Sequence, residues 1–180
     1  MGAELQVLDG CLQWRRYVSI IRTYAVSVDT WGTPHVDRIM REIISANVIE
    51  VERRLRLLGG VVTKQDLPFK ASTAKLWQAF DGLMQRRASH LPPERRGTFG
   101  LSEKAYFGYG GYATPYGPGR YLNPNYHTYD VHHVWPETLG GPTEGWNVVP
   151  LPKNVHLFTL HPILDDLVRR SAAGTHIRLL

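Results

Sequence analysis

The most constraining feature of this 180-residue chain is a pair of adjacent histidines placed just before a proline. The pair and the notable residues after it are, in order, His132, His133, Val134, Trp135, Pro136, Gly140, Gly141, Asn147 and His156. Neutral imidazoles bind borderline divalent metal ions, and an imidazole without a metal can take a proton from water near neutral pH. Two adjacent histidines can therefore divide metal binding and proton transfer between them.

The sequence around the pair predicts a strand, a loop, a second strand and a helix. Residues 126–135 are rich in aromatic and β-branched types and predict a strand that the following proline ends. Residues 140–145 have the composition of a surface turn, and residues 146–151 predict a second, short strand. Asn154 is a candidate N-cap for a helix to about Leu160, and Pro162 can start another that continues to Arg170.

Regular strand geometry conflicts with a shared role for the two histidines. Successive side chains of a strand point to opposite faces, so His132 and His133 could not both address one phosphate from an ideal strand. We therefore expect the strand to end or to bulge at His133.

The order and spacing of these residues resemble those of the HNH, or His-Me finger (ββα-metal), endonucleases. That family has an acidic residue or His, then His, an aliphatic residue, any residue and Pro, followed by a Gly-Gly loop, an Asn and a His on a helix. His156 follows Asn147 by nine positions, the spacing expected between the corresponding family residues. Residues 147–156 and the His-His pair are most similar to the colicin-type nucleases of bacterial toxins. The resemblance covers about residues 127–165.

The resemblance implies hydrolysis of DNA phosphodiester bonds with one divalent ion, namely Mg²⁺, Mn²⁺, Ni²⁺ or Zn²⁺. His132 would be the first metal ligand, and His156 the second. His133 would be the general base that activates water, and Asn147 would brace the loop that holds His133.

His161 is a third candidate ligand. Colicin-type nucleases have a His four residues after the first helical one, whereas His161 follows His156 by five. In a regular helix that spacing places the two side chains on different faces. Because Pro162 breaks a helix at this point, either the local geometry returns His161 to the site or water takes its place.

The charge balance favours a polyanionic partner. The chain has 21 Lys and Arg against 16 Asp and Glu, a formal net charge of +5. The candidate nucleic-acid contacts are Arg95, Arg96, Arg120 and Lys153. The Gly- and Tyr-rich connector 91–125 is either a loop packed by its own tyrosines or a surface whose aromatic rings stack on bases.

The first half of the chain is predicted to be helical. An amphipathic pattern begins at Val36 and continues to about Leu58, where Gly59 and Gly60 end it. A further helix is expected over residues 72–90, with Ser72 as its cap. The predicted fold class is therefore α+β: a mainly helical region, 1–95, followed by a ββα-metal nuclease region, 96–180.

Several functional alternatives stay open at this level. Similarity to the colicin-type enzymes implies an interbacterial toxin or effector domain that an acidic immunity protein neutralises, whereas other HNH enzymes serve phages or mobile elements. A noncatalytic, metal-stabilised nucleic-acid-binding module is a further alternative, and RNA remains an alternative to DNA. Cys11 is the single cysteine, which excludes an intramolecular disulfide. With neither a signal peptide nor an apolar membrane span, we expect a soluble, cytoplasmic chain, including one delivered into a target cell.

Overall fold

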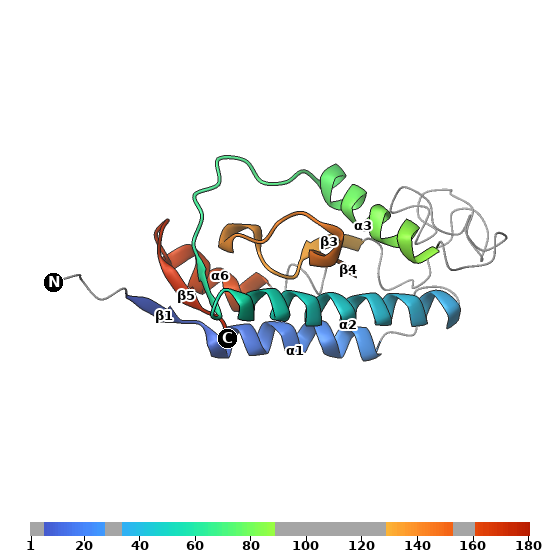
Figure 1. Cartoon of the computed structure of the whole chain (residues 1–180), viewed down its shortest axis with the longest axis horizontal. Coiled ribbons are helices and arrows are strands. Elements are labelled where there is room, and N and C mark those ends of the chain that lie inside the picture. Colours follow the sequence, from blue (N-terminus) through green and yellow to red (C-terminus); the bar gives the residue numbers. More distant parts are fainter. Residues whose placement is uncertain (1–5, 28–33, 89–128, 153–160) are drawn as a thin grey trace.

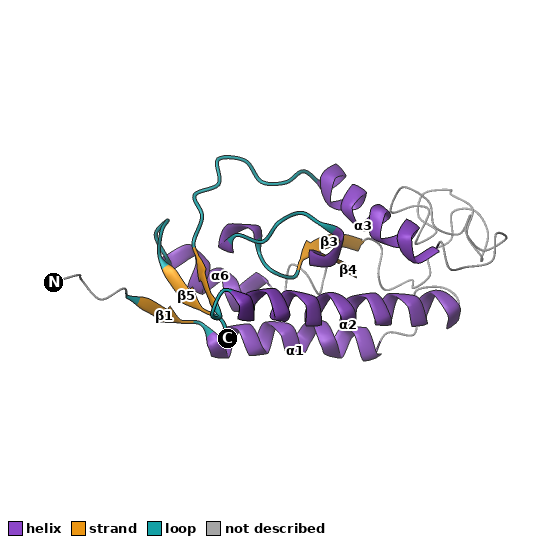
Figure 2. Cartoon of the chain, viewed as in Figure 1, coloured by secondary structure: helices purple, strands orange, loops and turns teal. Residues whose placement is uncertain are grey.

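Helices and two small sheets alternate along the chain, which therefore has an α+β fold (Figure 2). The computed structural model describes residues 6–27, 34–88, 129–152 and 161–180. Its helices and strands are β1 Val7–Asp9, α1 Cys11–Ser27, α2 Pro34–Leu57, β2 Val61–Thr63, α3 Thr73–Ala88, β3 Tyr129–His133, β4 Val148–Pro152, α6 His161–Arg170 and β5 His176–Arg178. Two short 3-10 turns, η2 Glu137–Leu139 and η3 Gly145–Asn147, lie between β3 and β4.

Helices α1 and α2 form an antiparallel pair along one side of the molecule (Figure 1). Their buried residues recur at helical spacing, and on α2 they include Ile44, Val48, Val51 and Leu55. Helix α2 ends at Leu57, and Gly59 and Gly60 in the turn after it both have left-handed backbone angles (φ 72° and 74°).

The hairpin of β3 and β4 lies between α2 and α3 (Figure 1). Its strands pair antiparallel, with His132 opposite Val149 and His133 opposite Val148. From the other side α3 buries Phe80 completely and partly buries Leu76 and Leu83 against the same core. The hairpin that carries the two histidines is thus covered by helices from the first half of the chain.

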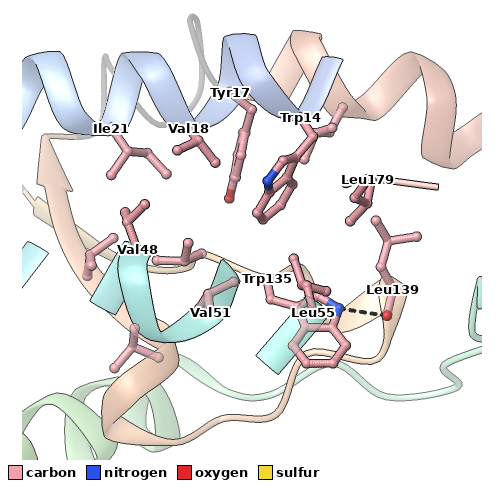
Figure 3. Packing of buried hydrophobic residues seen from close by; sticks show 14 of the residues in the cluster. Trp14, Tyr17, Val18, Ile21, Val48, Val51, Leu55, Trp135, Leu139 and Leu179 are labelled. Carbon is pink, nitrogen blue, oxygen red and sulfur yellow. Dashed lines mark hydrogen bonds between the residues drawn. The ribbon is translucent and has the colours of Figure 1, made fainter. Parts of the chain in front are cut away.

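Both halves of the chain contribute to one core. The three-stranded sheet has the order β1-β5-β2, in which β5 pairs parallel with β1 and antiparallel with β2. The cluster of buried hydrophobic residues likewise includes Trp14 and Tyr17 of α1 beside Trp135 and Leu179 (Figure 3). The boundary predicted near residue 95 therefore separates regions of different composition that share one core.

The predicted helices are confirmed with small shifts at their ends. The amphipathic segment 36–58 is helix α2, and the segment 72–90 is helix α3, whose Lys75 amide donates to Ser72 Oγ at 3.3 Å. The helix after Pro162 is also present, and it begins at His161. The helix expected between Asn154 and Leu160 lies outside the described residues.

The strands differ more from the prediction. Within the described residues β3 is shorter than the predicted 126–135, and β4 begins at Val148 because Gly145–Asn147 form a 3-10 turn. Strands β1, β2 and β5 were not predicted. Each has three residues, too few for an alternating pattern to be recognised.

None of the helices in the described part of the chain is both long and apolar enough to cross a membrane.

Asn47 joins α2 to the hairpin. Its buried side-chain amide donates to the carbonyl oxygens of Gly145 and Val148, at 2.9 and 2.8 Å. These carbonyls lie at the turn that precedes β4 and at its first residue. One polar side chain therefore fixes the start of β4 against the helix pair.

We expect Asn47→Ala to lower the free energy of unfolding by about 1–3 kcal/mol, because it removes the donor from two carbonyl groups in a buried interface. Urea denaturation measures this change. Ile49→Ala on the same helix is the matched control, since Ile49 is 59% exposed and its loss should cost less than about 0.5 kcal/mol. Equal losses in the two variants would contradict the role of the amide.

Candidate functional site

The two adjacent histidines lie at the end of β3. The strand ends at His133 with regular pairing up to that residue, which confirms the expectation that it must end or bulge there. Both histidines line one cavity of about 500 Å³. The end of the strand thus resolves the conflict that ideal strand geometry posed.

Asn147 holds the backbone that follows the histidines. Its side chain is fully buried, and Oδ1 accepts the Trp135 amide at 2.7 Å. Its Nδ2 donates to the carbonyl oxygens of Trp135 and Pro142, at 3.0 and 2.9 Å. The side-chain amide therefore pairs with both main-chain groups of Trp135, as a neighbouring strand would, and closes the loop between β3 and β4.

Positions 140 and 141 of the loop favour glycine for different structural reasons. Gly140 follows η2 with a left-handed conformation (φ 90°), which favours glycine. At Gly141 a Cβ atom would lie 1.8 Å from the Trp135 carbonyl oxygen and 3.0 Å from Asn147 Nδ2. Only glycine at 141 allows the loop to approach the contact between Trp135 and Asn147.

His133 is nearly buried and has a hydroxyl partner. The residue is only 9% exposed, and its Nε2 lies 2.8 Å from Thr143 Oγ1. Burial lowers the pKa of His133 below the ordinary 6.5, and the nearby negative charge of Glu137 acts in the opposite direction. The ring is therefore neutral at neutral pH, the form in which an imidazole can accept a proton.

Tyr17 of α1 connects the two histidines through one hydroxyl group. Its Oη lies 2.8 Å from the carbonyl oxygen of His133 and 2.5 Å from Nε2 of His132. Burial raises the pKa of Tyr17 well above its ordinary value, so the hydroxyl keeps its proton. The ring points from α1 into the core (Figure 3).

These contacts favour a proton on Nε2 of His132. A carbonyl oxygen can only accept, so the single hydroxyl proton of Tyr17 goes to His133. The contact with His132 then requires Nε2–H of His132 to donate to the tyrosine oxygen. In its neutral form His132 therefore has its lone pair on Nδ1, and this pair suits a divalent metal ion.

The charges around this cavity are mostly paired. Lys64 Nζ donates to the Val168 carbonyl oxygen at 2.6 Å, and Arg169 forms an ion pair with Asp165 at 3.2 Å. Both carboxylate oxygens of Glu137 accept the Ala71 amide at 3.1 Å. Lys70 lines the same wall and has no ion pair with a described residue.

The other candidate residues cannot be placed beside this pair. His156, Lys153, Arg95, Arg96 and Arg120 lie outside the described residues, and of His161 only the backbone, at the start of α6, is described. Among the described residues, no group of three or more His, Cys, Asp or Glu side chains is placed to hold a metal ion. A metal site that uses His132 would therefore need ligands such as His156 and His161.

Three residues that contact the histidines or act on them through charge were not identified from the sequence. Thr143 and Glu137 belong to the loop between the strands, where their types are ordinary for a turn. Tyr17 lies 115 positions before His132, and no local pattern connects the two. Only the folded contact could reveal these roles.

No protein-family model matches the chain, and neither a curated protein nor a solved structure matches it. What the chain can do must therefore be argued from the chemistry of these residues and from the motif.

We expect Tyr17→Phe to lower the free energy of unfolding by about 1–3 kcal/mol, because it leaves the His133 carbonyl and His132 Nε2 without their buried partner. Nitrogen-15 NMR of the parent protein should show His132 protonated on Nε2, and the variant should lose that preference. Thr63→Val is the matched control, since it removes a hydroxyl that contacts His176 Nδ1 at 3.1 Å and should leave His132 unchanged. Protonation of His132 on Nδ1 in the parent protein would contradict the assignment.

In the metal-free protein we expect His133 to titrate below pH 6.5, as measured by NMR in the presence of EDTA. Because its folded pKa is lowered, its contribution to stability is present above pH 6.5 and is lost as the pH falls through the folded pKa. Glu137→Gln should lower the midpoint further, because it removes the charge that favours the imidazolium ion. Glu144→Gln in the same loop is the control and should not move it. A midpoint above 6.5 would show that burial does not dominate.

Proposed function

We propose that the chain is a metal-dependent HNH endonuclease that hydrolyses phosphodiester bonds of DNA, with β3, β4 and the segment after β4 as its ββα-metal core. The observation that carries this proposal is the placement of His132 and His133 on one cavity, at a strand end that the buried Asn147 amide holds. Two imidazoles with different partners in one cavity suit a metal ligand beside a general base.

His133 is the general base of the proposed reaction. It accepts a proton from the attacking water at Nδ1, because Nε2 is occupied by its hydrogen bond with Thr143 Oγ1, which fixes the orientation of the ring. The lowered pKa keeps the ring ready to accept that proton, and the charge of Glu137 stabilises the imidazolium ion that results. Asn147 is a positioning residue, since it acts by holding the loop that follows His133.

His132 would hold the ion, together with His156 and, as a third candidate ligand, His161. A bound divalent ion, Mg²⁺, Mn²⁺, Ni²⁺ or Zn²⁺, would stabilise negative charge on the phosphoryl and leaving oxygens. Tyr17 supports the assignment of His132, because a hydrogen bond on one imidazole nitrogen fixes the other as the ligand atom.

The biological setting we propose is an interbacterial toxin or effector that an acidic immunity protein neutralises. The support is the resemblance of residues 127–165 to colicin-type nucleases, together with the net charge of +5, which suits both DNA and an acidic inhibitor. A phage or mobile-element nuclease would use the same site residues.

We expect His133→Ala to lower the rate of plasmid cleavage by about 10²- to 10⁴-fold, the usual contribution of a general base. The assay follows supercoiled plasmid, and RNA in parallel, with Mg²⁺, Mn²⁺, Ni²⁺ or Zn²⁺ and with EDTA. Titration calorimetry should show that the variant still binds metal, since His133 is not a ligand in this proposal.

His176→Ala is the matched control, because His176 lies on β5 and contacts Thr63 outside the cavity. It should cleave at the parent rate. Normal cleavage by His133→Ala would refute the role of His133, and nucleic acid left intact by the parent protein with every metal would refute the nuclease proposal. Retention of DNA without cleavage, with unfolding on chelation, would instead support a noncatalytic metal-stabilised module.

A further inference from the structure

A second cavity, of about 620 Å³, adjoins the one that contains the histidines. Lys70, Ala71 and Glu137 line both cavities, so the two meet along this wall. Thr143, the hydroxyl partner of His133, also lines the second cavity. A ligand that filled both would thus pass directly beside His133.

Two lysines on this cavity have no anionic partner among the described residues. The ammonium groups of Lys70 and Lys75 make no hydrogen bond or ion pair with a described residue, and both side chains are exposed. Five arginines elsewhere form ion pairs with carboxylates: Arg22, Arg53, Arg54, Arg169 and Arg170. The carboxylate in this cavity, Glu137, accepts the Ala71 amide with both oxygens. The cavity therefore has two lysine charges against one carboxylate charge, an excess of positive charge that suits an anion.

An exposed aromatic ring lies beside the lysines. Phe69 lines the cavity and is 87% exposed, more than any other large hydrophobic residue in the described part of the chain. A phenylalanine ring has no polar group to hydrate, so a ligand that covers it removes apolar surface from water. A flat apolar ring next to two cations matches a nucleobase with its flanking phosphates.

We propose that this second cavity binds a single-stranded segment of nucleic acid, with a base stacked on Phe69 and the backbone phosphates on Lys70 and Lys75. A base can stack on a side chain only when its face is not already covered by neighbouring base pairs, which excludes an intact duplex at this position. The identity of the ligand as nucleic acid rests on the proposed function. The position is new, since the sequence indicated Arg95, Arg96, Arg120, Lys153 and the connector 91–125 as nucleic-acid contacts.

The test is fluorescence anisotropy of a labelled oligothymidylate and of a labelled duplex, with the parent chain in EDTA so that metal-dependent cleavage does not occur. Phe69→Ala should weaken binding of the single strand by about 5- to 150-fold and leave duplex binding unchanged. Replacing both lysines, Lys70→Gln and Lys75→Gln, should reduce the slope of log affinity against log salt by about 0.7 for each lysine.

Matched controls keep the test specific. Leu57→Ala removes another exposed apolar side chain (73% exposed), and the pair Arg16→Gln and Arg56→Gln removes two exposed charges that line neither cavity. These variants should bind the single strand like the parent chain, apart from a small uniform loss from reduced net charge. All substitutions are at exposed positions, so thermal unfolding should be unchanged.

Equal binding of single strand by Phe69→Ala and the parent chain, or an unchanged salt slope in the double lysine variant, would overturn the inference. Because the readout is binding without metal, it is independent of cleavage. If the parent chain cuts plasmid but these substitutions do not change binding of the single strand, only the assignment of this cavity is refuted. If the single strand binds as expected but the parent chain never cuts nucleic acid, only the nuclease proposal is refuted.

Discussion

The arrangement of the candidate site depends on the buried side-chain amide of Asn147. Fully buried amides are nearly always hydrogen-bonded, and the partners of this one lie on Trp135 and Pro142. The loop between β3 and β4 must adopt the conformation that brings these partners to the amide. By taking both main-chain groups of Trp135, the amide replaces the strand partner that β4 would otherwise provide. The strand therefore ends where His133 reaches the cavity. Gly141 is part of the same constraint, since any Cβ there would collide with the Trp135 carbonyl.

Helices from the first half of the chain also hold the hairpin of β3 and β4 in place. Asn47 of α2 holds the start of β4 through two carbonyls, and Tyr17 of α1 contacts the last two residues of β3. Both side chains place a polar group in a region that is otherwise apolar. If α1 or α2 packed in another position, these buried polar groups would lose their hydrogen-bond partners. The site hairpin is thus fixed at both strands by helices that lie far away in the sequence, and the helical half is a structural part of the site.

The features predicted correctly from the sequence are those that a local sequence pattern determines. Helices α2 and α3 followed from apolar spacing and from end signals such as Ser72 and the Gly59-Gly60 pair, and the motif brought His132, His133 and Asn147 to attention together. Tyr17 could not be found, because its role arises from a contact across 115 positions. The three-residue strands β1, β2 and β5 are defined by their partners and have no periodicity of their own. Lys70 and Lys75 became notable only because the fold places both on a cavity where no described residue pairs with them.

The two adjacent histidines show how folding distinguishes residues of identical chemistry. Both have the same side chain at the end of one strand, yet Nε2 of His132 contacts a tyrosine that must receive its proton, while Nε2 of His133 contacts the hydroxyl of Thr143. The first contact leaves a lone pair on Nδ1, and burial keeps the second ring neutral. The difference that we propose between metal ligand and general base thus requires no difference in residue type. It requires that the hydroxyl group of Tyr17 on α1 reach the ring of His132, and that the hydroxyl group of Thr143 in the loop between β3 and β4 reach the ring of His133. The Asn147 amide holds this loop in place, and packing of the helix pair holds α1.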